Sequence, residues 1–505
     1  MAVFYNVGEE KIRPGVYQRY VNLDGQSPQG DAQDGICAIP VQANWGPLGT
    51  VVRNTSPLQL EETYGTGTYG TGYTVPAAAA MFDGGAATVY TCRLGTGGTQ
   101  ATKSITCPAP TVAEGATPGV AGTITVTAKY PGTMPISVAV QNKLGYATMK
   151  QFFVYAGSTQ VEAFDFEAND ASDADAITVT TNEGTNLVAA TANSNYVTVT
   201  ASATSPATAP TIVPITEVAS GALAGGANPT VTNASYSAAF QALEPYYYNC
   251  IALDVNDDAN LTLSLLLQEY LDNAYQYGKL GIAVVGEPTT VAWATRLQHA
   301  QAFNDPKVVY LGGGYMAGTT NKDGVLSICF AAGVIASTPS NSGITHTVIT
   351  EATDLCESLT YSQYEDAILA GMLMLSLSPD GDVWYDSGIT TLTDINNDNL
   401  DAGWKKIRRV KVRFELIDRL DRALAPKVGK VSADSDGISD IIQAGQRVLN
   451  LMANNEGKLQ SGATFVEDQD RPFTTDSAWF IIRADDVDSL EKIYLQYQFR
   501  YSQNV

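Results

Sequence analysis

Strands and helices alternate along the central part of the chain. Short apolar runs within 279–288 and 306–316 predict buried strands, and the amphipathic stretch 290–305 between them predicts a helix. Strands that alternate with helices form a parallel sheet that is covered on both faces. The pattern therefore predicts an α/β core made of residues 31–94 and 236–370.

Residues 95–235, between these two parts, follow a different pattern. Short alternating runs such as GTITVTAKY and YVTVTA are separated by glycine, proline and asparagine turns, which is typical of strands. The chain has no lysine or arginine between Lys150 and Lys279, and acidic residues cluster from Glu162 to Asp175. We therefore expect an inserted β-rich outer domain whose acidic face is solvated.

Residues 371–489 return to a mixed pattern. Amphipathic helices are predicted after residue 404 and at 438–457, and AWFIIRADD (478–486) predicts a strand. We expect a small α+β domain here. The apolar positions with helical spacing in its first helix are Ile407, Val410, Phe414, Ile417, Leu420 and Leu424.

Both ends of the chain are predicted to be extended arms. Residues 1–30 contain a short strand-like run after Pro14-Gly15, and residues 490–505 alternate apolar and polar residues from Ile493 onward. A terminal strand is frayed unless something pairs with it, and an open strand edge is a feature that soluble proteins usually avoid. The C-terminal arm therefore needs a partner strand.

Length and charge limit the classes of protein. Single cores stop growing at about 250 to 300 residues, so 505 residues predict several domains. Acidic residues outnumber basic ones by 52 to 29, which argues against a general nucleic-acid binder. We find no pattern of a signal peptide or a transmembrane helix, so we expect a chain that is made and folded in a cytoplasm.

Motifs of catalysis, cofactor binding and metal binding are weak. The six cysteines are dispersed without a C-x-x-C pair, and the only histidines, His299 and His346, have no obvious catalytic partner. The glycine-rich segments 65–72 and 311–316 lack the flanking elements of a nucleotide site, and 394–403 departs from a calcium loop. We therefore expect no cofactor, no metal and no enzyme activity.

A basic cluster interrupts this acidic sequence within nine residues. One interpretation is a solvated helix face with ion pairs such as Glu415 with Arg419 and Asp418 with Arg422. The other is a docking face for an acidic partner. The cluster consists of Lys405, Lys406, Arg408, Arg409, Lys411 and Arg413.

Five stretches, taken in order, resemble the sheath protein of contractile tails, as in myophages, PBSX-like prophages and R-type bacteriocins. Residues 160–230 depart from that pattern because they are longer than usual, which concerns the outer domain rather than the core. The five stretches are RPGVY (13–17), AKYPGT (128–133), TVTNASYSAAFQALEPYYYNCIAL (230–253), WKKIRRVKVR (404–413) and DSLEKIYLQYQFRY (488–501).

The resemblance implies an α/β sheath core, a β-rich outer domain, and two arms that add strands to the sheets of neighbouring subunits. It also implies flexible linkers near 25–35 and 485–489 and a C-terminal domain whose basic cluster faces an inner tube. The candidate arm residues are Val16, Tyr17, Tyr20, Val21, Ile493, Leu495, Tyr497, Phe499 and Tyr501.

The partners that the resemblance implies are further copies of the chain in hexameric rings stacked into a helical sheath, the inner tail tube protein, and baseplate and tail terminator proteins. Neither nucleic acid nor membrane insertion is expected. Assembly would take place in the cytoplasm of a bacterial host, and the product would be part of a virion tail or of a released contractile particle.

Two other classes stay open at this point. A secreted or surface β-rich binding protein would account for the threonine- and valine-rich segment. A nucleotide-dependent enzyme would use a doubly wound domain near 240–335 and would bind its ligand at the carboxyl ends of those strands.

Overall fold

The chain folds as a mixed α/β protein with several domains, as predicted. The computed structural model describes residues 3–4, 17–18, 34–65, 74–107, 122–146, 148–168, 183–203, 215–395, 400–474 and 476–499. The chain divides into two compact units. One consists of Asp34–Val412 with Asp488–Val505, and the other of Met1–Gln33 with Arg413–Val487.

A seven-stranded sheet forms the centre of the first unit. Neighbouring strands are parallel except β4 and β5, which are antiparallel. The whole of β3 is buried, as expected for a central parallel strand that is covered on both faces. In spatial order the strands are β19 (Met372–Leu373), β15 (Val308–Leu311), β14 (Ile282–Gly286), β13 (Cys250–Ala252), β3 (Ile36–Val41), β5 (Thr88–Arg93) and β4 (Val51–Asn54).

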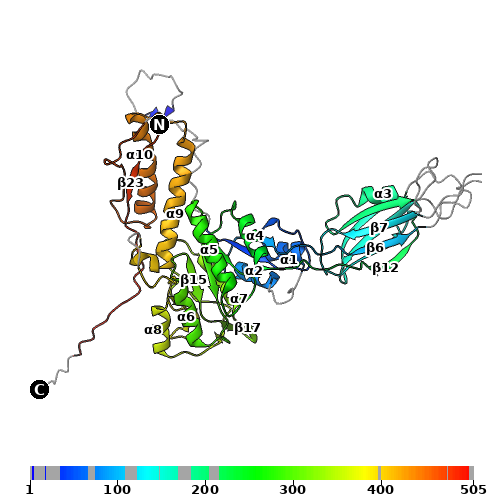
Figure 1. The fold of residues 1–505 in the computed structure, drawn as a ribbon, viewed down its shortest axis with the longest axis horizontal. Coiled ribbons are helices and arrows are strands. Elements are labelled where there is room, and N and C mark those ends of the chain that lie inside the picture. The colour runs from blue at the N-terminus through cyan, green and yellow to red at the C-terminus, as the bar shows by residue number, and fades with distance from the viewer. Residues whose placement is uncertain are drawn as a thin grey trace, which may run out of the picture. The chain divides into compact units, whose positions relative to one another are not determined.

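Helices cover both faces of this sheet (Figure 1). On one face α2 (Thr74–Asp83) packs against α7 (Val325–Ser337), and a Cβ on Gly333 would lie 2.1 Å from the carbonyl oxygen of Met81, so this close approach requires glycine. The other face packs into one apolar cluster with α4 (Asn233–Leu243), α5 (Thr262–Gln276), α6 (Trp293–Phe303) and α8 (Tyr361–Leu369).

The remaining elements of this α/β part are short. They are α1 (Pro57–Tyr64), η1 (Ala402–Lys405), the antiparallel strands β16 (Tyr315–Ala317), β17 (Thr320–Lys322) and β18 (Asp354–Leu355), and the hairpin β20 (Leu375–Leu377) with β21 (Val383–Tyr385).

The insertion is built from two antiparallel sheets around one core. Alternate residues of β7, such as Ile124 and Val126, point into this core and meet Val138 and Phe152 of the other sheet. One sheet has the order β10 (Thr159–Glu167), β9 (Met149–Ala156), β8 (Ile136–Asn142), β12 (Val218–Ala222), and the other β11 (Val197–Ala203), β7 (Gly122–Ala128), β6 (Thr102–Thr106); α3 (Glu183–Ala190) packs on β10 and β11.

The chain enters and leaves the insertion side by side, through antiparallel bridges such as Thr96 with Thr230. Arg93, at the end of β5, is buried and donates hydrogen bonds to the carbonyl oxygens of Gly46 at 2.7 Å and Pro131 at 2.8 Å. A Cβ on the adjacent Gly132 (φ +157°) would lie 2.0 Å from the carbonyl oxygen of Asn44. The turn AKYPGT is therefore the place where the insertion is tied to the α/β part.

The second unit contains the C-terminal part of α9 (Ile407–Leu424), η2 (Ala425–Lys427), α10 (Ser435–Asn450), the π-helical turn Leu451–Asn455, and the hairpin β22 (Thr464–Glu467) with β23 (Phe480–Arg483). Ion pairs join Glu415 with Arg419 at 2.5 Å and Asp418 with Arg422 at 3.0 Å, the two pairs that the helix-face interpretation named. Glu415 and Arg419 are buried, however, so this part of the helix is not the solvated face that was predicted. Ile417, expected on the apolar face, is exposed.

Candidate functional site

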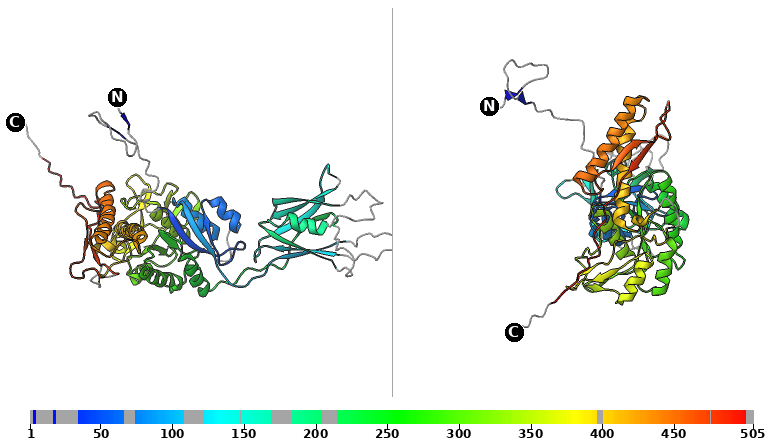
Figure 2. Two further views of the ribbon diagram at one scale, coloured as in Figure 1. Left: turned by 90° about the horizontal axis from the view of Figure 1, so that it is seen from above. Right: turned by 90° about the vertical axis from the view of Figure 1, so that its left-hand side faces the viewer.

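The C-terminal segment leaves the folded body as a single extended chain (Figure 2). Residues 492–499 are all exposed, and among the described residues none of them pairs with a strand. The predicted apolar face is in solvent: Ile493 is 71% exposed, Leu495 70%, Tyr497 73% and Phe499 92%. Apolar side chains so exposed, next to unpaired backbone groups, are typical of a segment that pairs with another chain.

The root of this segment, residues 488–491, is held by the basic cluster. Lys406 forms an ion pair with Glu491, whose other oxygen accepts a hydrogen bond from Thr345 at 3.2 Å. Arg408 donates to Ser489 Oγ at 2.8 Å. Arg409 Nη1 lies 4.0 Å from Asp488 Oδ2. Burial lowers the pKa of Lys406, which the nearby carboxylate of Asp488 opposes.

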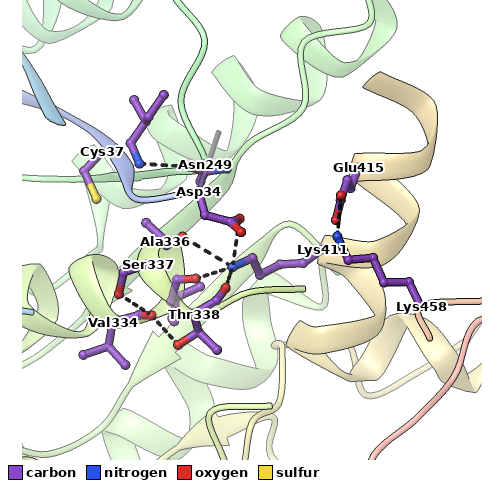
Figure 3. Close-up of polar contacts among 12 residues, drawn as sticks. Asp34, Cys37, Asn249, Val334, Ala336, Ser337, Thr338, Lys411, Glu415 and Lys458 are labelled. Atoms are coloured by element: carbon purple, nitrogen blue, oxygen red, sulfur yellow. Dashed lines mark hydrogen bonds and ion pairs between the residues drawn. The ribbon is translucent and has the colours of Figure 1, made fainter. Parts of the chain in front are cut away.

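Lys411 is also part of the basic cluster but is buried (Figure 3). Its ammonium group lies at the C-terminal end of α7 and donates to the carbonyl oxygens of Ile335 at 2.6 Å and Thr338, with that of Ala336 at 3.5 Å. Asp34 lies 3.9 Å away. A cation at this position satisfies carbonyls that a helix end leaves without intrahelical partners and complements the helix dipole.

The two remaining cations also have partners within the chain. Lys405 donates to the carbonyl oxygen of Thr393 at 2.5 Å, and Arg413 to Asp486 at 3.1 Å. The basic cluster is therefore engaged in internal contacts along its length, and Lys411 lies too deep to face a partner. The sequence shows a signal for this arrangement that we missed, because DDVDSLE (485–491) is an acidic counterpart of the cluster.

The N-terminal arm is only partly described. β1 (Val3–Phe4) and β2 (Tyr17–Gln18) pair in parallel, with Val3 opposite Tyr17, so this short contact lies within one chain. Tyr17 is the one predicted arm residue in it. Val16, Tyr20, Val21 and, at the other end, Tyr501 lie outside the described residues.

A groove of about 450 Å³ lies beside the root of the C-terminal segment. Its lining combines apolar side chains, such as Ile368 and Leu369, with Lys405, Lys406 and Glu491. The sequence does not indicate this groove, because its walls come from several separate segments between residues 345 and 492.

The crevice where a doubly wound enzyme would bind its ligand is filled. Asn256 accepts a hydrogen bond from the first amide of α7, and Asp257 accepts one from the amide of Ser264 in α5. A cavity at the carboxyl ends of β13 and β14 measures about 10 Å³, whereas ligand sites measure about 300 to 1,000 Å³. This geometry speaks against a nucleotide site there.

The glycine-rich segments do not have the context of a nucleotide site either. A helix, α1, precedes Gly65, and residues 66–73 lie outside the description. Gly312–Gly314 connect β15 to β16 rather than to a helix. Within the described residues there is no cluster that could hold a metal ion. No described helix has the length and apolar character to cross a bilayer.

Asp254 is a buried acid at the end of β13 that the sequence did not single out. It accepts hydrogen bonds from the amide of Gln42 at 2.6 Å and the hydroxyl of Tyr236 at 2.8 Å. Burial raises its pKa to about 6, although both hydrogen bonds act in the opposite direction. The carboxylate joins β3, β13 and α4, so we interpret it as a structural group.

This pKa predicts a pH dependence of stability. Between pH 4 and 6 the folded chain binds this proton more tightly than the unfolded chain, so the free energy of unfolding falls as the pH rises through this range. A pKa difference of about 2 corresponds to about 3 kcal/mol. Asp254→Asn should remove this contribution to the decrease of the unfolding free energy with pH. Urea unfolding at pH 4.5 and 7.5 measures the decrease.

Asp258→Asn is the matched control. Hydrogen bonds from Thr262 hold the pKa of Asp258 below its usual range, so this group titrates below pH 4.5 and its loss should leave the fall in unfolding free energy between pH 4.5 and 7.5 unchanged. Equal slopes for the natural chain and Asp254→Asn would contradict the interpretation of Asp254.

Residues 229–391 match the protein family described as the phage tail sheath protein central domain. No curated protein matches the chain in sequence. A sheath tail protein from Desulfitobacterium hafniense has a similar fold, with 19% identity, a TM-score of 0.67, and coverage of 95% of this chain and 99% of that chain.

Two further structures share this fold. A sheath tail protein from Listeria innocua is 18% identical, with a TM-score of 0.65 and coverage of 90% of this chain and 96% of that one. The helical sheath of the anti-feeding prophage in its contracted state is 11% identical, with a TM-score of 0.51 and coverage of 97% and 99%. The fold that the sequence resemblance implied is therefore confirmed.

Proposed function

We propose that this chain, which carries a phage tail sheath central domain and has the fold of sheath tail proteins, is the structural subunit of a contractile tail sheath. In this proposal copies of the chain polymerise helically around an inner tube, and contraction of the polymer drives the tube through a cell envelope. Assembly takes place in the cytoplasm of a bacterial host.

The observation that carries the proposal is the C-terminal segment 492–499. It has the alternation of a strand and exposes its apolar side chains, and it has no strand partner among the described residues. Addition of such a segment to a sheet of another copy would satisfy its backbone groups and bury Ile493, Leu495, Tyr497 and Phe499. Burial of one such side chain contributes about 1.5–3 kcal/mol before the cost of association.

The acceptor that we propose is the hairpin of β22 and β23 in a neighbouring copy. Each of these strands has one neighbour within the described residues, so each has an outer edge of backbone groups that can accept a further strand. Val466, Trp479 and Ile482 on or beside this hairpin are large apolar residues that are more than one-third exposed. An added strand would cover part of this surface.

Contact between one surface of each copy and a different surface of the next produces a helical polymer unless the rotation closes a ring. We propose that the copies form hexameric rings and that contacts of this kind stack the rings into a helical sheath. The baseplate and tail terminator proteins would bind at its two ends. For the inner tube protein we keep the basic cluster as the proposed contact and omit only Lys411, because it is buried. Its half-buried members already have partners within the chain, which the tube would have to share or displace; they are Lys405, Lys406, Arg408, Arg409 and Arg413.

Electron microscopy of the purified chain, alone and with an inner tube protein, tests the proposal. We expect helical polymers built from stacked rings. A chain that stays monomeric in gel filtration at micromolar concentration and moderate salt, with or without the tube, would instead favour a β-rich binding protein.

A further inference from the structure

We propose that residues 406–411, at the start of α9, form a clamp that positions the roots of both chain arms, and that its two contacts differ in kind. The root of the C-terminal arm is held by half-buried charges that solvent ions can reach, and it can be released. The root of the N-terminal arm is held by a buried cation and stays fixed. This inference rests on the proposed sheath function for its biological meaning, but not for its test.

The two roots meet the same short stretch of helix. Lys406, Arg408 and Arg409 contact Glu491, Ser489 and Asp488 in that order, so the C-terminal root runs antiparallel to the start of α9. A rise of about 1.5 Å per residue places Lys411 less than two turns further along the chain.

Lys411 connects the clamp to the N-terminal root. Asp34 lies 3.9 Å from its ammonium group, and the amide of Gly35 donates to the carbonyl oxygen of Ala336 at 2.8 Å, which Lys411 also approaches. Residues 34–35 thus lie at the C-terminal end of α7, directly before β3, and Lys411 bonds to the same group of carbonyls (Figure 3).

The difference between the two contacts follows from burial. The side chain of Lys411 is 7% exposed and bonds mainly to main-chain carbonyls, so salt screens it little. The C-terminal pairs are 20–39% exposed on each partner, within reach of mobile ions. Because the Debye length falls from about 8 Å at physiological ionic strength to about 3 Å at 1 M, salt weakens these pairs selectively.

The consequence for a polymer joined by its arms is a hinge at one root and a fixed joint at the other. A neighbour that pulls on the C-terminal arm transmits the load to α9 through Lys406, Arg408 and Arg409. These side chains are therefore positioning residues, which set the direction in which the arm leaves and permit that direction to change when subunits repack.

The test measures the arm in the unassembled chain. A fluorophore is attached to Gln496→Cys in a Cys356→Ser background, because the other five cysteines are buried. We expect lower fluorescence anisotropy at 1 M than at 0.05 M sodium chloride. At 0.05 M salt, each of the single variants Lys406→Glu and Glu491→Lys should show the same decrease in anisotropy. The exchanged pair Lys406→Glu with Glu491→Lys should restore the natural value, while the exposed Lys430→Glu should have no effect.

Hydrogen exchange of the Gly35 amide measures the other root in the same samples. It should be unchanged by salt and by Lys406→Glu, and at least tenfold faster in Lys411→Met. Anisotropy that is independent of salt, or an exchanged pair no better than the single variants, would overturn the proposal. Because these readouts need no polymer, they distinguish a failed clamp from a failed sheath function.

Discussion

Truncation of the chain after Glu491 is expected to abolish helical polymers and leave a folded monomeric body. The truncation removes Lys492–Val505 but keeps the ion pair between Lys406 and Glu491, so the root of the arm is undisturbed. The body should remain intact because residues 492–499 are exposed and have no strand partner among the described residues. Negative-stain microscopy should show the loss of polymers, and thermal unfolding should change by less than 2 °C.

A pair of proline substitutions separates backbone pairing from simple loss of chain length. Leu495→Pro with Tyr497→Pro removes two amide donors from the arm and should also abolish polymers, because proline cannot donate to a ladder. Leu495→Val with Tyr497→Phe keeps both donors and the alternation, and should still polymerise. Polymers that persist in the truncated chain would show that the arm is not the joint.

Replacement of Lys411 by methionine is expected to lower the free energy of unfolding of the α/β part by about 3 kcal/mol. Methionine fills similar space but leaves the carbonyls of Ile335 and Thr338 without their cation and Asp34 without its neighbour. Such orphaned buried groups carry most of the loss. Urea unfolding that is monitored through hydrogen exchange of the β3 amides measures this free energy in the unit that contains Lys411.

Lys427→Met is the matched control. The Lys427–Asp440 pair is an exposed ion pair, for which a loss below about 1 kcal/mol is expected. Equal effects of the two substitutions would mean that the buried position of Lys411 contributes little to stability, and the fixed joint at the N-terminal root would lose its support.

Much of the fold could be read from local patterns. The helix 290–305 and the strands within 279–288 and 306–316 were predicted correctly, and they correspond to α6, β14 and β15. The compositional change at residue 95 coincides with the bridge between Thr96 and Thr230, where the insertion begins. These features are local, because apolar period and turn residues are determined by neighbours in sequence.

The candidate site could be predicted only in part. The alternation from Ile493 to Phe499 predicted the apolar face, and the structure shows this face exposed and without a strand partner among the described residues. The basic cluster was visible, but its contacts were not. Lys411 and Arg409 are two residues apart, yet one is buried against α7 and the other reaches the C-terminal root.

The amino-acid sequence alone predicted the elements, the β-rich insertion and a C-terminal segment with the alternation of a strand. The tertiary structure decided which charges remain available, because a charged side chain is either exposed or internally paired according to what packs next to it. Ile335 of α7 and Ser489 of the C-terminal root lie 76 and 81 residues in sequence from the α9 residues that they contact, and they meet them only after folding. Long-range contact of this kind leaves no periodic pattern that could be read beforehand.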